Sequence, residues 1–224
     1  MVQPYPKPLA PQADLGVFKA YCRPDTATLK LKHKLFSFSG DDAVVTDNNS
    51  GDVVFKCSGS LLSGGGRRVV SDAAGNTLYA LARKVYHDAA LHDVAFVAED
   101  AAGREVFEVR GLSCIRAAAQ ATFPHAARQG LTQILFLKTD DSWGGYSDVV
   151  IEETGAVVAQ ICPDLLEVRH LIEDRQTYYL VVAPGVDLAL VTAMAVCFDE
   201  LKNKGEWNGT YRGVSLSKTG GVAL

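Results

Sequence analysis

The sequence predicts a mainly β fold, a closed antiparallel barrel of ten to twelve strands around a buried hydrophobic C-terminal helix. Short apolar runs alternate with polar residues along most of the chain, an Asp and Gly hairpin phrase recurs, and residues 186–203 are apolar on nearly every side. A helix that is apolar all round must be buried, and strands surround it completely only when their sheet closes on itself. The helix would fill the cavity that a barrel of this size otherwise leaves.

The composition is that of an ordinary globular protein. The chain has 224 residues, of which 48% are hydrophobic and 21% are charged, and its formal net charge is −4. An acidic balance argues against a protein that coats nucleic acid, because such domains carry a basic surplus. The N-terminus lacks the apolar core of a secretory signal. We therefore expect a cytoplasmic protein that is not secreted, with nuclear or peripheral-membrane locations left open.

The five cysteines fit reduced thiols better than cross-links. They are odd in number and lie 35 or more residues apart, whereas disulfide frameworks and zinc sites favour close pairs. The thiols expected in the core are those of Cys22, Cys57, Cys114, Cys162 and Cys197.

The chain divides into an arm, one domain and a tail. Residues 1–16 are rich in proline and form the predicted arm, residues 17–204 form a single barrel domain, and residues 205–224 form a loose tail. In the domain, Val17–Tyr21 and Thr28–Phe38 alternate as strands with one buried and one wet face do.

A repeated phrase then predicts four β-hairpins. Each copy is an apolar strand, a turn and a second apolar strand, as in Val44–Phe55. An Asp early in a short loop hydrogen-bonds the backbone, and a late Gly adopts positive φ. Calcium binding is the weaker interpretation, because an EF-hand loop needs more acidic positions. The turn glycines are Gly51, Gly75, Gly103 and Gly155.

The stretches between the hairpins are less regular. Gly64–Arg68 is expected to join two strands, and Lys84–Asp93 is expected to be a polar linker that contains His87 and His92. Gly111–Ala127 is rich in alanine and fits either one helical turn or irregular strands.

The last third of the barrel leads into the helix. Leu131–Leu137, Leu165–Ile172 and Thr177–Val182 read as strands, and Asp140–Tyr146 reads as a loop. Pro184-Gly185 then marks a turn before the helix.

The predicted helix suits a core better than a membrane. Asp187 lies at one end of its apolar run and Asp199-Glu200 lies at the other. The run between them is shorter than the roughly 20 apolar residues that a spanning helix needs.

These elements resemble the LURP-one-related family, which belongs with the Tubby C-terminal domain and the phospholipid scramblases. The resemblance rests on Val69–Leu81 with Arg83-Lys84 behind it, on Ala159–Ile161, and on Thr177–Leu190 running into the helix. It implies a barrel of about twelve strands around a central helix. Tubby domains bind phosphoinositide head groups and scramblases act on bilayers, but no residue here matches a lipid-site motif closely enough to carry over.

Binding of a phospholipid head group needs cations that converge on phosphates. Two consecutive hairpins carry such cations, which would share one flank of the barrel, although ordinary solvated surface charge explains them equally well. The candidates are Lys56, Arg67, Arg68, Arg83 and Lys84.

Catalytic and metal-binding patterns are weak in this sequence. It has no G-x-S-x-G elbow, and neither Cys114 nor Cys162 lies in a recognisable nucleophile setting. His87 and His92 are five residues apart, which matches neither helical nor strand spacing for a pair of metal ligands. We therefore expect no enzyme activity, no cofactor and no metal.

Two hypotheses follow. The first is a non-enzymatic intracellular adaptor that docks on anionic phospholipid, phosphoinositides included, through a basic flank. The second is a protein-interaction module without a lipid role, which would use aromatic residues in loops such as Asp140–Tyr146 or Trp207–Tyr211.

Overall fold

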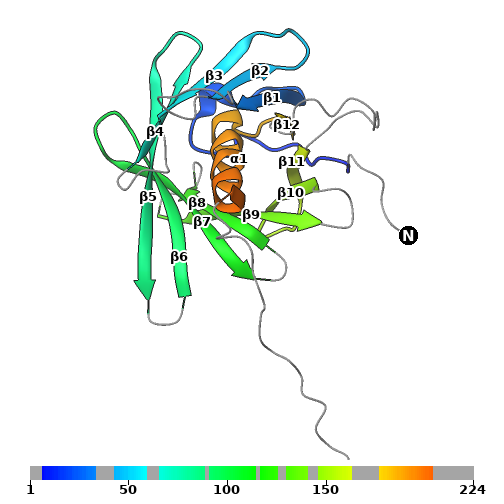
Figure 1. The fold of residues 1–224 in the computed structure, drawn as a ribbon. Coiled ribbons are helices and arrows are strands. Elements are labelled where there is room, and N and C mark those ends of the chain that lie inside the picture. Colours follow the sequence, from blue (N-terminus) through cyan, green and yellow to red (C-terminus); the bar gives the residue numbers. More distant parts are fainter. Residues whose placement is uncertain are drawn as a thin grey trace, which may run out of the picture.

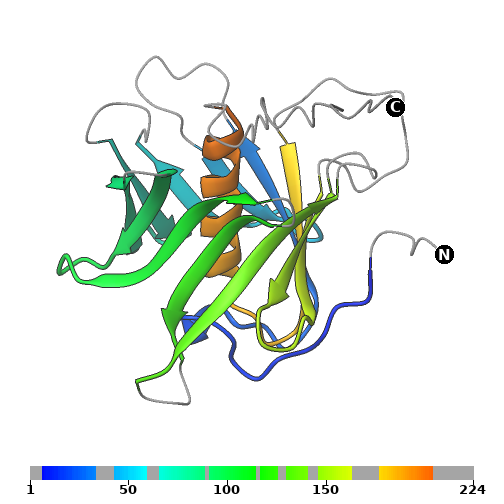
Figure 2. The same cartoon turned by 90° about the horizontal axis from the view of Figure 1, so that it is seen from below.

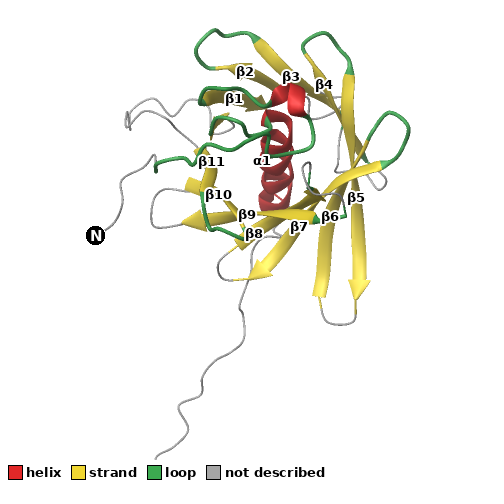
Figure 3. Cartoon of the chain, turned by 180° about the vertical axis from the view of Figure 1, so that it is seen from behind, coloured by secondary structure: helices red, strands yellow, loops and turns green. Residues whose placement is uncertain are grey.

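In the computed structural model, twelve antiparallel strands close into a barrel with one helix along its interior (Figures 1 and 3). The structure describes residues 7–33, 43–59, 66–88, 91–114, 117–125, 130–140, 146–162 and 177–203. Strands that follow one another in the chain are neighbours in the sheet, and β1 pairs with β12 to close the ring. The predicted fold class is confirmed.

The described elements have the following bounds. A short 3-10 helix, η1 (Lys19–Tyr21), precedes the barrel, and α1 (Leu188–Asn203) follows it. The strands are β1 (Ala27–His33), β2 (Ala43–Asp47), β3 (Val53–Ser58), β4 (Arg67–Asp72), β5 (Thr77–Asp88), β6 (Leu91–Glu99), β7 (Glu105–Cys114), β8 (Ala117–Pro124), β9 (Thr132–Asp140), β10 (Tyr146–Ile151), β11 (Val157–Cys162) and β12 (Thr177–Val182).

The helix is the centre of the core, as the sequence predicted. Every residue from Leu188 to Phe198 is at most 4% exposed, so α1 has no wet face over these turns. Alternate residues of the strands point inward and pack on it. Complete burial of one side chain such as Leu190 stabilises the fold by about 1.5–3 kcal/mol, so the helix and the wall depend on each other.

The four predicted hairpins are present, and each turn glycine has positive φ. A hydrogen-bonded Asp shapes three of the turns. In the β6–β7 turn, for example, the Asp100 carboxylate accepts the backbone N–H groups of Ala102 and Arg104, and the Arg104 N–H holds the pKa of Asp100 below its usual value. The φ values are 77° at Gly51, 92° at Gly75, 76° at Gly103 and 68° at Gly155.

Two local predictions were wrong. Lys84–Asp93 is not a linker but part of the β5–β6 hairpin, in which His87 and His92 lie directly opposite each other. This ribbon extends past the end of α1 (Figure 1). Val17–Tyr21 is not a strand, because the N–H groups of Val17 and Phe18 bond to a side chain and η1 follows.

The Ala-rich stretch forms strands rather than a helical turn over its described residues in β7 and β8. α1 lies against both strands, and the small inward-facing residues Ala119 and Ala121 are fully buried there. A Cβ on Gly111 would come within 2.9 Å of Leu201 on the helix. The stretch therefore needs small residues because the helix is close, not because it is helical.

Two more predicted strands lie within the described residues, and several other predicted segments do not. Leu131–Leu137 lies largely within β9, and Thr177–Val182 is β12. Residues 64 and 65 lie outside the description, while Arg67 and Arg68 belong to β4 itself. Leu165–Ile172, the tail at 205–224 and most of the loop at 140–146 also lie outside the described residues.

The N-terminal arm forms part of the fold over residues 7–16. It crosses the end of the barrel at which α1 begins (Figure 2). The Ala10 N–H donates to the Val157 carbonyl, and the Leu15 N–H donates to the Gly185 carbonyl, both at 2.8 Å. Leu15 is 5% exposed and belongs to the core. The arm therefore closes this end of the barrel.

A buried carboxylate joins the arm to the helix. Asp187 is 0% exposed, and its Oδ2 accepts the N–H groups of Val17 at 3.0 Å and Phe18 at 2.7 Å. Its Oδ1 accepts those of Ala189 at 2.8 Å and Leu190 at 3.3 Å, which caps α1. Burial raises the pKa of Asp187 above its usual range, and the four N–H donors oppose that rise.

Gly16 makes this arrangement possible. Its φ is 141°, and a Cβ at this position would lie 2.2 Å from the Cβ of Asp187. The chain can pass over the buried carboxylate only where a residue has no side chain.

We expect Asp187→Ala to destabilise the protein by about 3–5 kcal/mol, because it removes a helix cap and leaves buried donors without acceptors. Urea unfolding followed by circular dichroism measures this loss. Asp100→Ala, which also removes a carboxylate with two backbone donors but at an exposed turn, is the control and should cost far less. Equal losses would contradict the role given to Asp187.

Candidate functional site

The five predicted cations do not share one flank, because strand alternation separates them. Lys56, Arg67 and Lys84 point outward. Arg68 lies opposite Leu81 and Arg83 lies opposite Phe96, and both of these apolar partners face the core. Arg68 and Arg83 therefore point toward the barrel interior.

Arg68 is a structural residue. It is 0% exposed, and its guanidinium lies 3.1 Å from Oε1 of Glu200 in the last turns of α1. Cys197 lies nearby on the helix, where burial raises the pKa of its thiol and the Arg68 charge lowers it. The ion pair connects β4 to α1 inside the barrel, so the assignment of Arg68 to an exposed basic flank needs correction.

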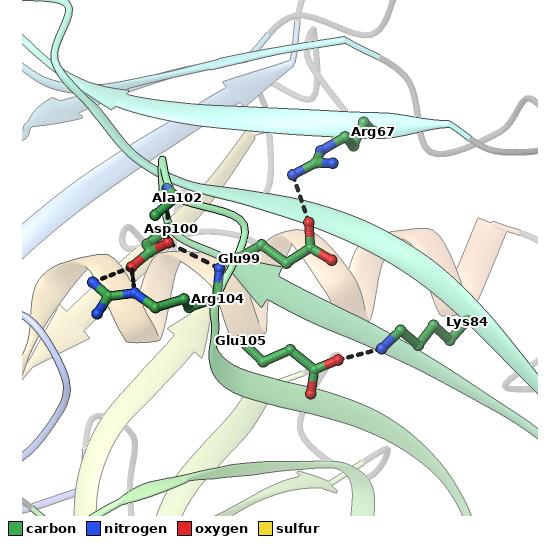
Figure 4. A network of polar contacts seen from close by, with 7 residues as sticks. All are labelled: Arg67, Lys84, Glu99, Asp100, Ala102, Arg104 and Glu105. Carbon is green, nitrogen blue, oxygen red and sulfur yellow. Dashed lines mark hydrogen bonds and ion pairs between the residues drawn. The ribbon is translucent and has the colours of Figure 1, made fainter.

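The outward cations of β4 to β7 are paired with carboxylates. Arg67 contacts Glu99 at 2.6 Å, and Lys84 contacts Glu105 (Figure 4). Arg104 contacts Asp100 at 2.8 Å in the same network. We call these six residues the paired flank. Three cations and three carboxylates leave it without net charge, so it has little attraction for an anionic surface.

A second group of cations lies on the outer face of β1 and β3. Lys30 and Lys32 are outward residues of β1, and Lys56 is an outward residue of β3. Lys32 lies opposite Val44 of β2, and Val44 lies opposite Lys56, so these three residues form one row across the wall. Strand geometry places Lys32 about 10 Å from Lys56 and about 7 Å from Lys30.

An aromatic ring borders these lysines. Lys30 lies opposite Tyr179 of β12, and its Nζ is 5.8 Å from the centre of that ring, a cation–π contact. Lys32 and Lys56 are exposed, and the Lys56 ammonium donates to the Ala73 carbonyl at 3.3 Å. We call Lys30, Lys32, Lys56 and Tyr179 the lysine face.

The strands that carry the lysine face are poor in carboxylates. Within the described bounds of β12, β1, β2 and β3, the sole acidic residue is Asp47, at the very end of β2. Asp47 is already paired with Arg23. Elsewhere in the described barrel, acidic residues are more frequent, as on β6 and β7.

Sequence reasoning noticed Lys30 and Lys32 as the wet side of a strand but did not propose them as a site. The alternation of leucine and lysine showed which residues point outward. It did not show that β3 would bring Lys56 beside them, because that depends on strand order and register.

A groove of about 430 Å³ lies at the barrel end where α1 begins. It runs between η1 and the turns of the β2–β3 and β4–β5 hairpins. Its lining includes Val53, which is 36% exposed, together with Tyr21 and Leu188. Burial raises the pKa of Tyr21, as do the charge and hydrogen bond of Asp72. The charged residues of the lining are Asp47, Asp52, Asp72 and Arg23, a net charge of −2 from three carboxylates and one guanidinium.

The cysteines that the structure describes form no disulfide with one another. Cys57, Cys162 and Cys197 are buried, as predicted, and Cys22 is half-buried. Burial raises the pKa of Cys162 to about 12, so this residue is a thiol and not a nucleophilic thiolate at neutral pH. The side chain of Cys114 lies outside the description. Among the described residues, no three metal-ligating side chains gather at one place.

A family model described as LURP-one-related matches residues 27–199, from β1 into the last turns of α1. The chain belongs to the LURP-one-related family. The solved structure of a protein from Arabidopsis thaliana resembles this LURP-one-related chain with a TM-score of 0.54 and 18% identity, over 85% of this chain and 99% of that one. At that identity, the likeness establishes the fold alone.

No curated protein matches the sequence. The LURP-one-related family is not known as a family of enzymes. In the described part of the chain, no helix combines the length and the apolar character that crossing a bilayer requires.

The free energy of unfolding tests whether Arg68 is buried and Arg67 is exposed. Arg68→Met should cost about 3–5 kcal/mol, because it leaves the carboxylate of Glu200 buried without its cation. Arg67→Met breaks a half-exposed pair with Glu99 and should cost about 1 kcal/mol or less. Urea unfolding of the two variants measures the difference, and equal losses would show that Arg68 is not an interior residue.

Proposed function

We propose that this chain is a non-enzymatic intracellular adaptor that docks on anionic phospholipid through the lysine face. The observation that carries the proposal is the placement of Lys30, Lys32 and Lys56 on the outer face of β1 and β3, on either side of β2, in three strands whose described lengths hold one terminal carboxylate. The other four cations that the sequence suggested support it less well, because Arg68 and Arg83 point into the barrel and the paired flank, which holds the other two, is neutral.

The expected strength of docking follows from the number of lysines. Each Lys near an anionic leaflet contributes about 1 kcal/mol, so three lysines contribute about 3 kcal/mol, roughly a hundredfold in affinity. Tyr179 suits the interface, since tyrosine combines an apolar ring with a polar hydroxyl. Such docking is weak and reversible, as an adaptor requires.

The net charge of −4 does not oppose this proposal. The Debye length is about 8 Å at physiological ionic strength, so carboxylates elsewhere on the barrel are screened from a bilayer at the lysine face. The lysine face is the part of the wall that turns toward the lipid.

The test is co-sedimentation with vesicles that contain anionic lipid, against neutral vesicles. Lys30→Gln/Lys32→Gln should lower the affinity about thirtyfold, because it removes about 2 kcal/mol of attraction. Lys84→Gln/Arg104→Gln changes the net charge equally but alters the paired flank, and it should retain binding within about threefold. Equal losses in the two variants would show that overall charge, rather than the lysine face, governs binding.

Arg68 is unsuitable for such a test. Its side chain is buried against Glu200, so a substitution there changes folding as well as surface charge. The lysines chosen above lie on the outer wall, and circular dichroism should show unchanged folding in both double variants.

A second candidate function is favoured by the groove. A concave site with apolar lining and a net charge of −2 has the chemistry to receive a partner segment that carries a basic and an apolar side chain. The loops first considered for partner binding, at 140–146 and 207–211, lie largely or entirely outside the described residues. The groove is therefore the better basis for a protein-interaction role.

Asp52→Arg/Val53→Arg tests the groove with a labelled peptide that contains arginine and leucine, read by fluorescence anisotropy. We expect at least about a tenfold loss of affinity, because the substitutions reverse charge and block the apolar lining. Glu153→Arg, at the exposed turn of the β10–β11 hairpin, is the control and should bind normally. Binding that survives the double substitution would exclude the groove.

A further inference from the structure

The lysine face lies on the outside of a closed barrel, and such a wall is convex. Outward side chains on neighbouring strands of a convex wall diverge instead of converging. Lys32 and Lys56 are separated by a whole strand, β2, whose opposite residue is Val44. A site that encloses one small head group is concave and has converging polar groups. These lysines instead lie on a convex surface and point away from one another.

The chemistry of the three cations also argues against a site that encloses one head group. All three are lysines, whose ammonium groups act as rotatable point charges. Stereospecific phosphate recognition typically uses the fixed, bidentate fork of arginine. One lysine of the three, Lys30, is additionally held over the ring of Tyr179. The face thus presents spread positive charge without a cradle for a phosphate.

We infer that the lysine face recognises the charge density of an anionic bilayer, not the stereochemistry of one phosphoinositide head group. This inference rests on the proposed lipid docking. The partner is a surface on which several anionic lipids meet the three lysines at once. Phosphatidylserine therefore suffices, phosphoinositide regioisomers are equivalent at equal surface charge, and a soluble inositol phosphate is a poor competitor.

Vesicle binding at matched surface charge tests this inference. Four compositions are compared by co-sedimentation: neutral phosphatidylcholine alone, and the same lipid with phosphatidylserine, with phosphatidylinositol 4,5-bisphosphate or with the 3,5-bisphosphate. We expect the three anionic compositions to bind within about threefold of one another. Soluble inositol 1,4,5-trisphosphate at the concentration of accessible lipid should displace less than half of the protein. A regioisomer preference above about tenfold, or full displacement, would overturn the inference.

Single substitutions provide a second, independent readout. If charge density is recognised, Lys30→Gln, Lys32→Gln and Lys56→Gln should each lower the affinity by a similar factor, about fivefold. The triple Lys→Arg variant should bind at least as well as the natural sequence, because charge is kept. One dominant lysine, or loss of binding in the arginine variant, would indicate a shaped site and contradict the inference.

The outcomes separate the inference from the function on which it rests. Binding to no anionic vesicle would refute lipid docking altogether, and the inference with it. Binding with strong regioisomer preference would retain lipid docking and refute the inference alone. Binding that follows surface charge, with equal lysine contributions, supports both.

Discussion

The carboxylate of Asp187 connects the three parts of this fold. One oxygen caps α1 through Ala189 and Leu190, and the other binds the backbone of the N-terminal segment at Val17 and Phe18. A fully buried carboxylate is costly, and here four N–H groups offset the loss of water. The start of α1 and the placement of the N-terminal segment beside it are therefore set at one point.

The sequence predicted those parts of the fold that depend on local chemistry. Glycine at a positive-φ turn position and an apolar run without a wet side are local signals, and both the hairpins and α1 followed from them. The β5–β6 ribbon was missed because the His and Asp residues of its sequence suggested a polar linker rather than strands. Alanines in β8 were ambiguous because close approach to a helix and helical propensity both favour small residues.

The candidate site was less predictable, since it depends on which residues share a face across several strands. Two adjacent residues of one strand point to opposite sides, and this separates exposed Arg67 from buried Arg68. Proximity in the sequence suggested one basic flank. Register instead distributes its members between an internal ion pair with Glu200 and a neutral surface network, and it places Lys56 one strand away from Lys32 of β1.

The helix occupies the interior of the barrel. A barrel of twelve strands without a helix would enclose a ligand cavity, but here residues such as Leu190 and Met194 are fully buried in that space. Tyr79, whose hydroxyl donates to the Ala189 carbonyl at 2.9 Å, fastens the wall to the helix from within. The outside of the described barrel offers two geometries for recognition. The convex wall suits an extended charged surface, and the concave end suits a short segment of chain. We propose that a molecule with both surfaces, of opposite charge, brings a basic partner to an anionic membrane.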